Sequence, residues 1–480
     1  MSILSQYEPK KVLHYFEELT KIPRGSGNEK AVSDYLKKFA EDRNLEVIQD
    51  EILNIIIKKP GTPGYENSKP VIIQGHMDMV DEKNNDTVHD FKKDPLKLRI
   101  LDDHLYGEGT TLGADNGIAV AYALAILDSS DIPHPPLEVL ITVEEETGMI
   151  GASYVDGSQF EGKMLINIDS EEEGTFLVSC AGGARQTVKL PLAYTKAEGH
   201  SYKLSITGLK GGHSGMDIIK ERGNSNVLLG RTLQMLHGKF DFLITGLHGG
   251  SKNNAIPREA EAILVFTGKT EGLLEEVAKI ENTLGNEIET QDDDFNITFS
   301  KTDTPSECYD KETTRKAIGL LFTLPNGVIS MSQDISGLVE TSLNLGVLHE
   351  EENELHFDFA VRSSVGSRKE MVLDKVKTIG EVFGASAQIN SSYPEWTYAK
   401  ESNLRDTFIK VYETKYGVTP KIEAIHAGLE CGILSGRIEG LDMISLGPNL
   451  FDVHTPDEHM DLKSVRNVYE FLLEALKKLK

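Results

Sequence analysis

The stretch LYGEGTTLGADNGIAVAYALAIL (Leu105–Leu127) carries Asp115 in a glycine-rich turn, directly before an alanine-rich apolar helix. Glycine permits strained or positive-φ backbone conformations, and the N-terminus of a helix favours negative charge. Taken alone, Asp115 is an ordinary helix cap. Because four other segments end in side chains of similar chemistry, we interpret Asp115 as the centre of a site that they share.

The four segments are short apolar runs that end in histidine, aspartate or glutamate. They are VIIQGHMDMV (Val71–Val80), LEVLITVEEETG (Leu137–Gly148), KMLINIDSEEEG (Lys163–Gly174) and LDMISLGPNLFDVHTPDE (Leu441–Glu458). Short apolar runs that alternate with helices are typical of a parallel sheet covered on both faces. In open α/β sheets, ligands bind at the carboxyl ends of the strands. The pattern therefore predicts an α/β domain with a mixed, mostly parallel sheet and a site at its carboxyl ends.

Residues 184–396 have a different pattern, in which longer alternating strands lie between helical stretches. About 210 residues is large for one domain, so we predict an inserted α+β domain of two successive similar units. The first domain then consists of residues 1–183 and 397–480. The predicted helices of the insertion are Asn226–Leu236, Gly272–Leu284, Glu312–Leu324 and Met371–Phe383.

Composition limits the classes of protein to which the chain can belong. The chain has 480 residues, a formal net charge of −26 and three cysteines. The negative charge argues against partners such as nucleic acid or an anionic membrane surface, and no apolar run approaches the roughly 20 residues that span a bilayer. Widely spaced cysteines and an N-terminus without signal-peptide features favour a reducing compartment. We expect a cytoplasmic globular protein.

Metal binding follows from the residue types at the strand ends. Zinc binds imidazole nitrogen and carboxylate oxygen, and a catalytic site keeps one position open for water. Two divalent cations carry a charge of about +4, which three carboxylates and one hydroxide nearly neutralise. The candidate metal ligands are His76, Asp115, Glu146, Asp169 and His454.

Two further carboxylates are expected to assist these ligands. Asp78, two residues after His76, can hold the second ring nitrogen of that histidine. Glu145 and Glu146 point in different directions at a strand end, so Glu145 is free to act as a general base. It would take a proton from water bound to the metal.

Each candidate also has an ordinary structural interpretation. His76 can be a satisfied core histidine, and the run Glu144–Glu146 can be a solvated strand end. His454 can be a surface histidine, and Glu171–Glu173 is expected to be solvated or to lie outside the ligand sphere. These interpretations weaken together because the same strand-end placement would have to arise by chance in every segment.

The motifs GHMDMV, GTTLGADNG, TVEEETG, LINIDSEEEG and GPNLFDVHTPDE resemble, in order and spacing, the dizinc peptidase family that contains carboxypeptidase G and the di- and tripeptidases. The closer resemblance is to the aminoacyl-histidine dipeptidases, also called cytosol non-specific dipeptidases. Their hallmarks are similar to GLKGGHSGMDIIKERGNSN, GGSKNNAIPREA, AVRSSVGS, SSYPEW and AIHAGLECG in this chain. The resemblance covers essentially the whole sequence.

This resemblance implies a catalytic domain made of both chain ends, with the insertion acting as a lid. It implies that Asp115 bridges two zinc ions and that the Asp115–Asn116 peptide bond is cis. One ion would be completed by His76 and Asp169. Glu146 and His454 would complete the other, with Glu145 as the base.

The resemblance also implies roles for residues that would otherwise be taken as turn or strand-edge residues. His213 is similar to the histidine that stabilises the tetrahedral oxyanion. Arg362 fits the arginine that binds the carboxylate terminus of the substrate. Asn254 is expected to position the substrate backbone, and Glu430 to meet its free amino group.

We therefore predict metal-dependent hydrolysis of dipeptides with free amino and carboxyl termini, including Xaa-His and broader dipeptides. A metal-bound hydroxide would attack, with Glu145 as general base. The cofactor would be two divalent ions per chain, Zn²⁺ first, with Mn²⁺ and Co²⁺ as alternatives. Small peptides are the expected partners, and a homodimer stays open. The alternative activity is an amidohydrolase or deacylase acting on N-acyl amino acids, and a metal-binding scaffold without activity is a third hypothesis.

Overall fold

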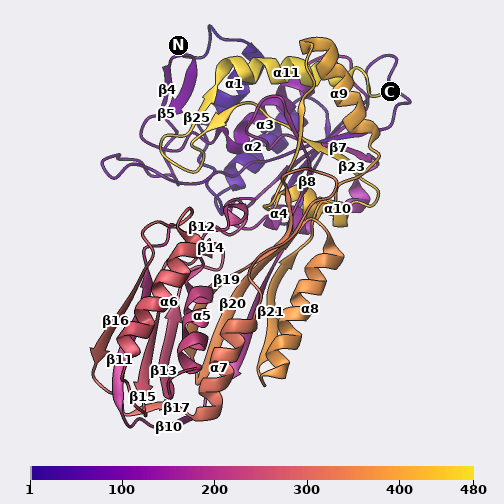
Figure 1. The fold of residues 1–480 in the computed structure, drawn as a ribbon. Helices are drawn as coiled ribbons and strands as arrows, with labels where there is room; N and C mark the ends of the chain where they lie inside the picture. The colour runs from indigo at the N-terminus through magenta and orange to yellow at the C-terminus, as the bar shows by residue number, and fades with distance from the viewer. Residues whose placement is uncertain (1–2) are drawn as a thin grey trace. The chain divides into compact units, whose positions relative to one another are not determined.

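The structure is a computed structural model that describes residues 3–480 and divides into two compact units. Unit 1 comprises Met1–Cys180, Tyr398–Ala424 and Leu429–Lys480. Unit 2 comprises Ala181–Thr397 and the short segment Ile425–Gly428. Each unit has its own large sheet (Figure 1). Each also has its own apolar core.

The large sheet of unit 1 has eight strands in the order β1-β2-β6-β3-β7-β23-β8-β22. Its central strands β6, β3, β7 and β23 are parallel to one another, whereas β1, β2 and β8 pair antiparallel with their neighbours. The predicted mixed, mostly parallel sheet is confirmed. The strands are β1 (Glu46–Gln49), β2 (Ile55–Lys59), β3 (Val71–His76), β6 (Leu137–Thr142), β7 (Met164–Asn167), β8 (Thr175–Cys180), β22 (Lys421–Ile425) and β23 (Asp442–Ser445).

The helices of unit 1 pack around one apolar core that both parts of the unit share. Nearly every side chain of α3 (Ala114–Leu127) is buried, because small alanines let this helix lie inside the unit. The Tyr122 hydroxyl of α3 donates to the Val465 carbonyl, which lies far along the chain, at 2.7 Å. The other helices are α1 (Lys10–Leu19), α2 (Lys30–Glu41), α4 (Ile150–Tyr154), α9 (Asn403–Tyr416), α10 (Glu430–Arg437) and α11 (Leu462–Leu476).

A small four-stranded sheet in the order β24-β25-β5-β4 carries the segments before α3 and α11. Pairing of β25 with β5 brings the loop of His454 toward the glycine-rich turn of Asp115, because these two strands flank those segments. The strands are β4 (Leu98–Leu101), β5 (His104–Gly107), β24 (Leu450–Phe451) and β25 (His459–Asp461).

Unit 2 is built on a nine-stranded antiparallel sheet with the order β16-β11-β15-β13-β19-β20-β9-β21, and β18 (Gly327–Met331) pairs with β19. Its two halves share the element order strand, helix, two strands, helix, strand. The first half is β11 (His200–Thr207), α5 (Ser225–His237), β13 (Phe242–Gly249), β15 (Ala260–Phe266), α6 (Leu273–Ile288) and β16 (Asn296–Thr302). The second is β9 (Gly182–Pro191), α7 (Lys311–Thr323), β19 (Val339–Glu351), β20 (Glu354–Ser363), α8 (Gly366–Val382) and β21 (Ser386–Tyr393).

The halves are nested and not successive as the sequence pattern suggested. Strand β9 precedes the whole first half, yet it pairs with β20 and β21 of the second half. Sequence periodicity marks strands but not their partners, so it could not reveal this insertion. The second strands of the two halves, β13 and β19, pair at the junction.

Smaller features complete the fold. Two short strand pairs lie in unit 2: β10 (Tyr194–Lys196) with β17 (Glu307–Tyr309), and β12 (Gly212–His213) with β14 (Ala255–Ile256). Cys180, Cys308 and Cys431 are buried thiols. Across residues 3–480, every helix is too short or too polar to cross a bilayer.

Candidate functional site

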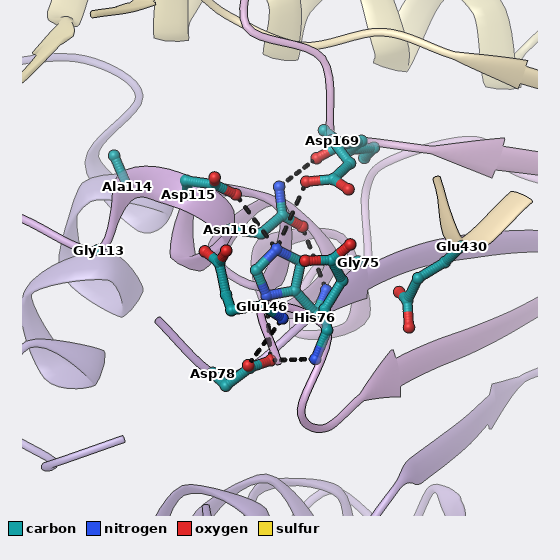
Figure 2. A network of polar contacts seen from close by, with 12 residues as sticks. Gly75, His76, Asp78, Gly113, Ala114, Asp115, Asn116, Glu146, Asp169 and Glu430 are labelled. Carbon is teal, nitrogen blue, oxygen red and sulfur yellow. Dashed lines mark hydrogen bonds and ion pairs between the residues drawn. The ribbon is translucent and has the colours of Figure 1, made fainter. Parts of the chain in front are cut away.

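The candidate metal ligands of unit 1 come together where the central parallel strands end, and Figure 2 shows His76, Asp115, Glu146 and Asp169 among them. Strand β3 ends at His76, and the chain after β6 supplies Glu145 and Glu146. Asp169 follows β7, and His454 lies beyond β23. These strands are adjacent and parallel, so their carboxyl ends deliver all of these side chains to one place, as predicted from the strand-end pattern.

The ligand atoms form two trios that share Asp115. In the first, His76 Nε2 lies 3.1 Å from Asp115 Oδ1 and 3.5 Å from Asp169 Oδ1. In the second, His454 Nε2 lies 3.3 Å from Asp115 Oδ2 and 3.0 Å from Glu146 Oε2. The two oxygens of one carboxylate therefore face different trios, which is the geometry of a bridging ligand.

The turn that presents Asp115 is held by a buried carboxylate, that of Glu458. Its Oε2 accepts the backbone N–H groups of Leu112 and Gly113 at 2.7 and 2.9 Å. Its Oε1 accepts those of Ala114 and Asp115 at 2.8 and 3.3 Å. A carboxylate that accepts several N–H groups at a helix start is favourably placed, because these donors have no partner within the helix.

Arg24 joins the Asp115 turn to the end of β3. Its Nη1 donates to the carbonyls of Met77 and Asp78 at 2.8 and 3.0 Å, and its Nη2 donates to the Gly113 carbonyl. Gly113 has a φ of +66°, and a Cβ there would lie 2.5 Å from Arg24 Nη2. Only glycine therefore fits this close approach of guanidinium and backbone.

Asn116 links α3 to two strand ends. Its Oδ1 accepts the backbone N–H of His76 at 3.2 Å, and its Nδ2 donates to the Ile168 carbonyl at 2.6 Å (Figure 2). The peptide bond between Asp115 and Asn116 is cis, as the family resemblance predicted. One side chain thus sets the relative positions of the backbone that carries His76 and Asp169.

Asp78 lies beneath the site and is fully buried. Its Oδ1 lies 3.2 Å from His76 Nδ1, so the carboxylate contacts the ring nitrogen that faces away from the trio. It also accepts the backbone N–H groups of Glu145 and Glu146 at 3.1 and 3.3 Å, and the Ser26 hydroxyl at 2.8 Å. Asp78 therefore fixes the orientation of His76 and the start of the glutamate loop together.

The electrostatics of the site reflect crowded carboxylates in a buried place. Burial raises the pKa of Asp169 to about 7. Burial and the nearby carboxylate of Asp169 likewise hold the pKa of Glu145 well above its ordinary value, although His76 opposes this. Contacts with Asp115 and Glu146 raise the pKa of His454 to about 11. Burial opposes ionisation of Asp115, but the imidazoles of His454 and His76 lower its pKa below the ordinary value.

These residues fit a pair of divalent cations. Four carboxylates and two imidazoles converge in overlapping groups that can each hold a metal ion. Glu146 Oε1 is buried without a hydrogen-bond partner among residues 3–480, although burying an unpaired carboxylate oxygen is costly. Nitrogen and carboxylate oxygen donors suit zinc, and a cation would supply the missing interaction.

Glu430 is near this site but completely buried. Its Oε2 accepts hydrogen bonds from Gln74 Nε2 at 2.5 Å and from the Thr142 hydroxyl at 2.7 Å. Burial raises its pKa to about 7. Both partners lie on the sheet, so Glu430 faces the strands, and its predicted contact with a substrate amino group stays a prediction.

In unit 2, His213 and Asn254 are neighbours across the strand pair β12 and β14. His213 pairs with Ala255, and the Ser214 N–H donates to the Asn254 carbonyl at 2.9 Å. His213 Nδ1 accepts the N–H groups of Gly215 and Met216 at 3.3 and 3.1 Å. Because Nδ1 is an acceptor, the proton of the neutral ring lies on Nε2, which is then available as a donor.

Arg362 belongs to the same cluster in unit 2. A Cβ on Gly215 would lie 3.1 Å from both Arg362 Nε and His213 Cε1, so both side chains lie close to this glycine. Arg362 Nη1 donates to the Tyr393 hydroxyl at 3.2 Å, while Nε is buried without a partner among the described residues. Burial and the Arg362 charge lower the pKa of His213.

Sequence reasoning missed four residues of these clusters. Arg24, Asn116 and Glu458 position the metal-type ligands, and His426 lies beside Arg362 and His213, with its Nε2 2.7 Å from the Ser342 hydroxyl. Glu458 and His426 lie in motifs that were noticed, HTPDE and AIHAG. Neither motif indicates which distant backbone or side chain its residue meets.

Comparisons with known proteins indicate one peptidase family over most or all of the chain. The model of Peptidase family M20/M25/M40 matches residues 72–478. The chain is 39% identical to the cytosol non-specific dipeptidase of Escherichia coli (strain K12), covering 100% of this chain and 99% of that protein.

Two solved structures are similar. The aminoacylhistidine dipeptidase from Vibrio alginolyticus matches with a TM-score of 0.95 at 36% identity, covering 100% of this chain and 98% of that one. Aminopeptidase PepT from Bacillus cereus matches with a TM-score of 0.56 at 16% identity, covering 98% and 99% of the two chains, which indicates a shared fold alone.

Proposed function

Because this chain belongs to peptidase family M20/M25/M40, we propose that it is a metal-dependent dipeptidase that cleaves dipeptides with free amino and carboxyl termini. The observation that carries the proposal is Asp115, whose two carboxylate oxygens face two separate groups of metal-type ligands. The full-length relatives named as a cytosol non-specific dipeptidase and an aminoacylhistidine dipeptidase support the substrate class. Xaa-His dipeptides are included in the proposed range.

The proposed cofactor is two divalent ions per chain, with Zn²⁺ preferred and Mn²⁺ or Co²⁺ as alternatives. His76 and Asp169 would hold one, Glu146 and His454 the other, and Asp115 both. When bound, such ions polarise a carbonyl group and lower the pKa of water. Asp78 would keep His76 oriented by facing its second ring nitrogen.

Glu145 is the proposed general base. Its backbone is fixed by Asp78, and burial makes its carboxylate a stronger proton acceptor than an exposed one. It would take the proton of the attacking water and then deliver it to the leaving amine. The backbone of Glu146 is held by the same aspartate, and its side chain points to the His454 trio. Glu145 would therefore act as the base and Glu146 as a metal ligand.

Unit 2, the nested pair of similar halves, is proposed to act as the lid. His213 would donate from Nε2 to the oxyanion of the tetrahedral intermediate, since its Nδ1 is occupied as an acceptor. The Arg362 guanidinium suits the carboxylate terminus of a dipeptide. Asn254, beside His213, would position the substrate backbone. Recognition of the amino terminus by Glu430 remains part of the proposal.

The proposed setting is the cytoplasm, as the name of the Escherichia coli relative suggests for that protein. The net charge of −26 makes nucleic acid an unfavourable partner. Small peptides are the proposed partners of the site, and a homodimer is compatible with it.

The test is hydrolysis of a panel of free dipeptides, including carnosine, together with N-acetyl amino acids. The protein would be assayed after chelation and after reloading with Zn²⁺ or Mn²⁺. We expect cleavage of free dipeptides that returns with metal. In Glu145→Gln the rate should fall by about 10²–10⁴-fold while metal binding is retained, and Glu144→Gln serves as the matched control.

Two results would contradict the proposed activity, and a third would contradict the role of Glu145. Cleavage restricted to the acylated amino acids would identify an amidohydrolase, which is the alternative activity. Metal binding without turnover of any substrate would favour the hypothesis of a metal-binding scaffold without activity. A free-dipeptide rate unchanged in Glu145→Gln would remove this residue from the mechanism.

A further inference from the structure

We propose that unit 2 contains an additional metal site, formed by His349, Glu351 and His356, which takes a zinc-type divalent ion. The site lies on the β19–β20 hairpin and uses no residue of the candidate active site. It is therefore independent of the proposed function.

The local sequence places these side chains on one face of the hairpin. The segment HEEENELHFD (His349–Asp358) makes a two-residue turn at Glu352 and Asn353, whose φ values are +49° and +64°. Positive φ at both positions is typical of the tight turns that join antiparallel strands. The turn sets the register so that His349 is directly opposite His356, and Glu351 is opposite Glu354.

Alternation along the strands separates this cluster from the core. Leu355 and Phe357 belong to the apolar core of unit 2. Because neighbouring residues of a strand point to opposite faces, His356 and Asp358 point to the other face of the sheet. His356 is largely buried on that face, with only 7% of its side chain exposed. A buried polar side chain needs an interaction partner, because water cannot reach it.

The three candidate ligand atoms, one from each of these side chains, have the spacing of metal ligands. Glu351 Oε2 lies 3.5 Å from His356 Nδ1 and 3.8 Å from His349 Nε2. All three atoms lie within 4.8 Å of one another. Ligand atoms around a tetrahedral zinc ion lie about 3.4 Å apart, given bonds of roughly 2.0–2.2 Å. Small changes of rotamer would therefore bring the three atoms to the spacing of zinc ligands. Three protein ligands leave a fourth position for water.

Each imidazole also has a carboxylate behind it. His349 Nδ1 lies 3.6 Å from Asp358 Oδ2, and His356 Nε2 lies 3.4 Å from Glu354 Oε2. Metal-binding histidines almost always direct their second nitrogen to such a partner, which fixes the ring and its tautomer. Asp358 is itself anchored, because its other oxygen accepts the Thr187 hydroxyl. The pattern of ligand, imidazole and outer carboxylate occurs here twice.

The charges favour a cation. Glu351, Glu354 and Asp358 supply three negative charges around two imidazoles, which outweigh the single positive charge of Lys189, the register partner of His356 on β9. His349 Nδ1 is buried without a hydrogen-bond partner among residues 3–480. A divalent ion bound to His349 Nε2 would leave Nδ1 as a proton donor and draw it to Asp358.

The test counts metal ions in variants that differ only in the hairpin. Wild-type protein, His349→Gln/His356→Gln and Glu351→Gln would be stripped with a chelator, refilled with Zn²⁺ and desalted. We expect the double variant to retain one zinc equivalent per chain less than the wild type. Glu351 is mostly exposed, so Glu351→Gln should fold normally and bind the additional ion more weakly.

Thermal unfolding gives a second readout. Reloading with Zn²⁺ should raise the Tm of the wild type more than that of the double variant, since a bound ion stabilises the folded state. His248→Gln, which changes an exposed histidine of β13, is the matched control and should behave like the wild type in both measurements. Equal zinc content and equal zinc-dependent Tm shifts in the wild type and the double variant would overturn the proposal. The histidines would then serve only as partners of the surrounding carboxylates.

Discussion

The carboxylate of Glu458 accepts the backbone N–H of Asp115 at 3.3 Å, so a residue far along the chain fixes the aspartate that two groups of metal-type ligands share. Three further N–H groups of the same turn bind this carboxylate. The contact converts a glycine-rich turn, which is flexible by composition, into a defined support for Asp115.

Glu458→Gln should weaken the Asp115 turn. Four backbone N–H groups donate to the Glu458 carboxylate. A glutamine side chain has only one acceptor oxygen, and its NH₂ group cannot accept, so these N–H groups lose a charged acceptor. Each hydrogen bond to a charged group contributes about 1.5–3 kcal/mol, and we expect a loss of that size in the free energy of unfolding, together with weaker zinc binding. Denaturant unfolding and calorimetric zinc titration measure the two effects.

Asp457→Asn is the matched control, because the neighbouring Asp457 is exposed and its side chain takes no part in the turn of Asp115. It should behave like the wild type. Unchanged stability and zinc affinity in Glu458→Gln would show that the turn keeps its shape without this carboxylate.

The place of Asp115 in both trios makes Asp115 and Asp169 unequal. Asp115→Asn should weaken both metal positions, whereas Asp169→Asn should weaken one, because Asp169 faces only the His76 trio. We expect affinity at an affected position to fall by about 100-fold or more, since partners outside the ligand sphere already change it by 10–100-fold. Metal content after dialysis against a weak chelator distinguishes the two variants.

Glu172→Gln is the control for this series, since Glu172 is exposed and pairs with Lys421 outside the trios. Its metal content should equal that of the wild type. If Asp115→Asn and Asp169→Asn lost the same single ion, Asp115 would not be a shared ligand.

Arg24→Met should strongly destabilise unit 1. The buried guanidinium donates to backbone carbonyls of two segments. Its removal takes the charged donor from the carbonyls of Met77 and Asp78, while the Gly113 carbonyl keeps the N–H of Gly117 at 3.2 Å. It also leaves Asp78 and Glu458 without a neighbouring positive charge. Breaking such a buried charged contact costs about 3–5 kcal/mol, which unfolding by urea would measure.

Arg24→Lys should fall between Arg24→Met and the wild type, because a lysine keeps the charge but cannot reach both segments with a planar fork. The exposed Arg466, paired with Glu470, offers the control Arg466→Met, which should change stability by less than about 1 kcal/mol. A small effect of Arg24→Met would mean that neither segment depends on this contact.

His426 should make unit 2 sensitive to acid. Burial, with the charge of Arg362, lowers the pKa of His426 to about 3. The unfolded chain takes up this proton below its ordinary pKa of about 6.5, while the folded chain does not until about pH 3. Stability is therefore full above pH 6.5 and decreases as the pH falls from 6.5 toward 3.

His426→Gln removes this titration. Relative to pH 8, the wild type should lose about 2 kcal/mol more than the variant at pH 5, although the variant is weakened at pH 8 by the altered contact with Ser342. The Tm of both proteins measured from pH 5 to 8 tests this, with the exposed His248→Gln as control. Parallel Tm curves for wild type and His426→Gln would contradict the prediction.

Much of unit 1 could be predicted because its information is local. Apolar runs of four to six residues, such as β3 and β6, are buried parallel strands, as their composition indicated. Each run ends in its own His, Asp or Glu, so adjacency of the parallel strands was enough to gather His76, Glu146 and Asp169. The family motifs supplied the expectation of a cis bond after Asp115, which the structure has.

The sequence by itself therefore determined the element types, the α/β class of unit 1 and the residues that converge at its strand ends. Tertiary structure alone decided the contacts between distant segments. These include Glu458 and Arg24 around the Asp115 turn, the insertion of the first half of unit 2 between β9 and the rest of the second half, and the opposition of His349 and His356. The physical reason is that periodicity and motifs record which way a side chain points along its own element. Strand pairing and the satisfaction of buried donors depend on partners that any of many distant residues could supply.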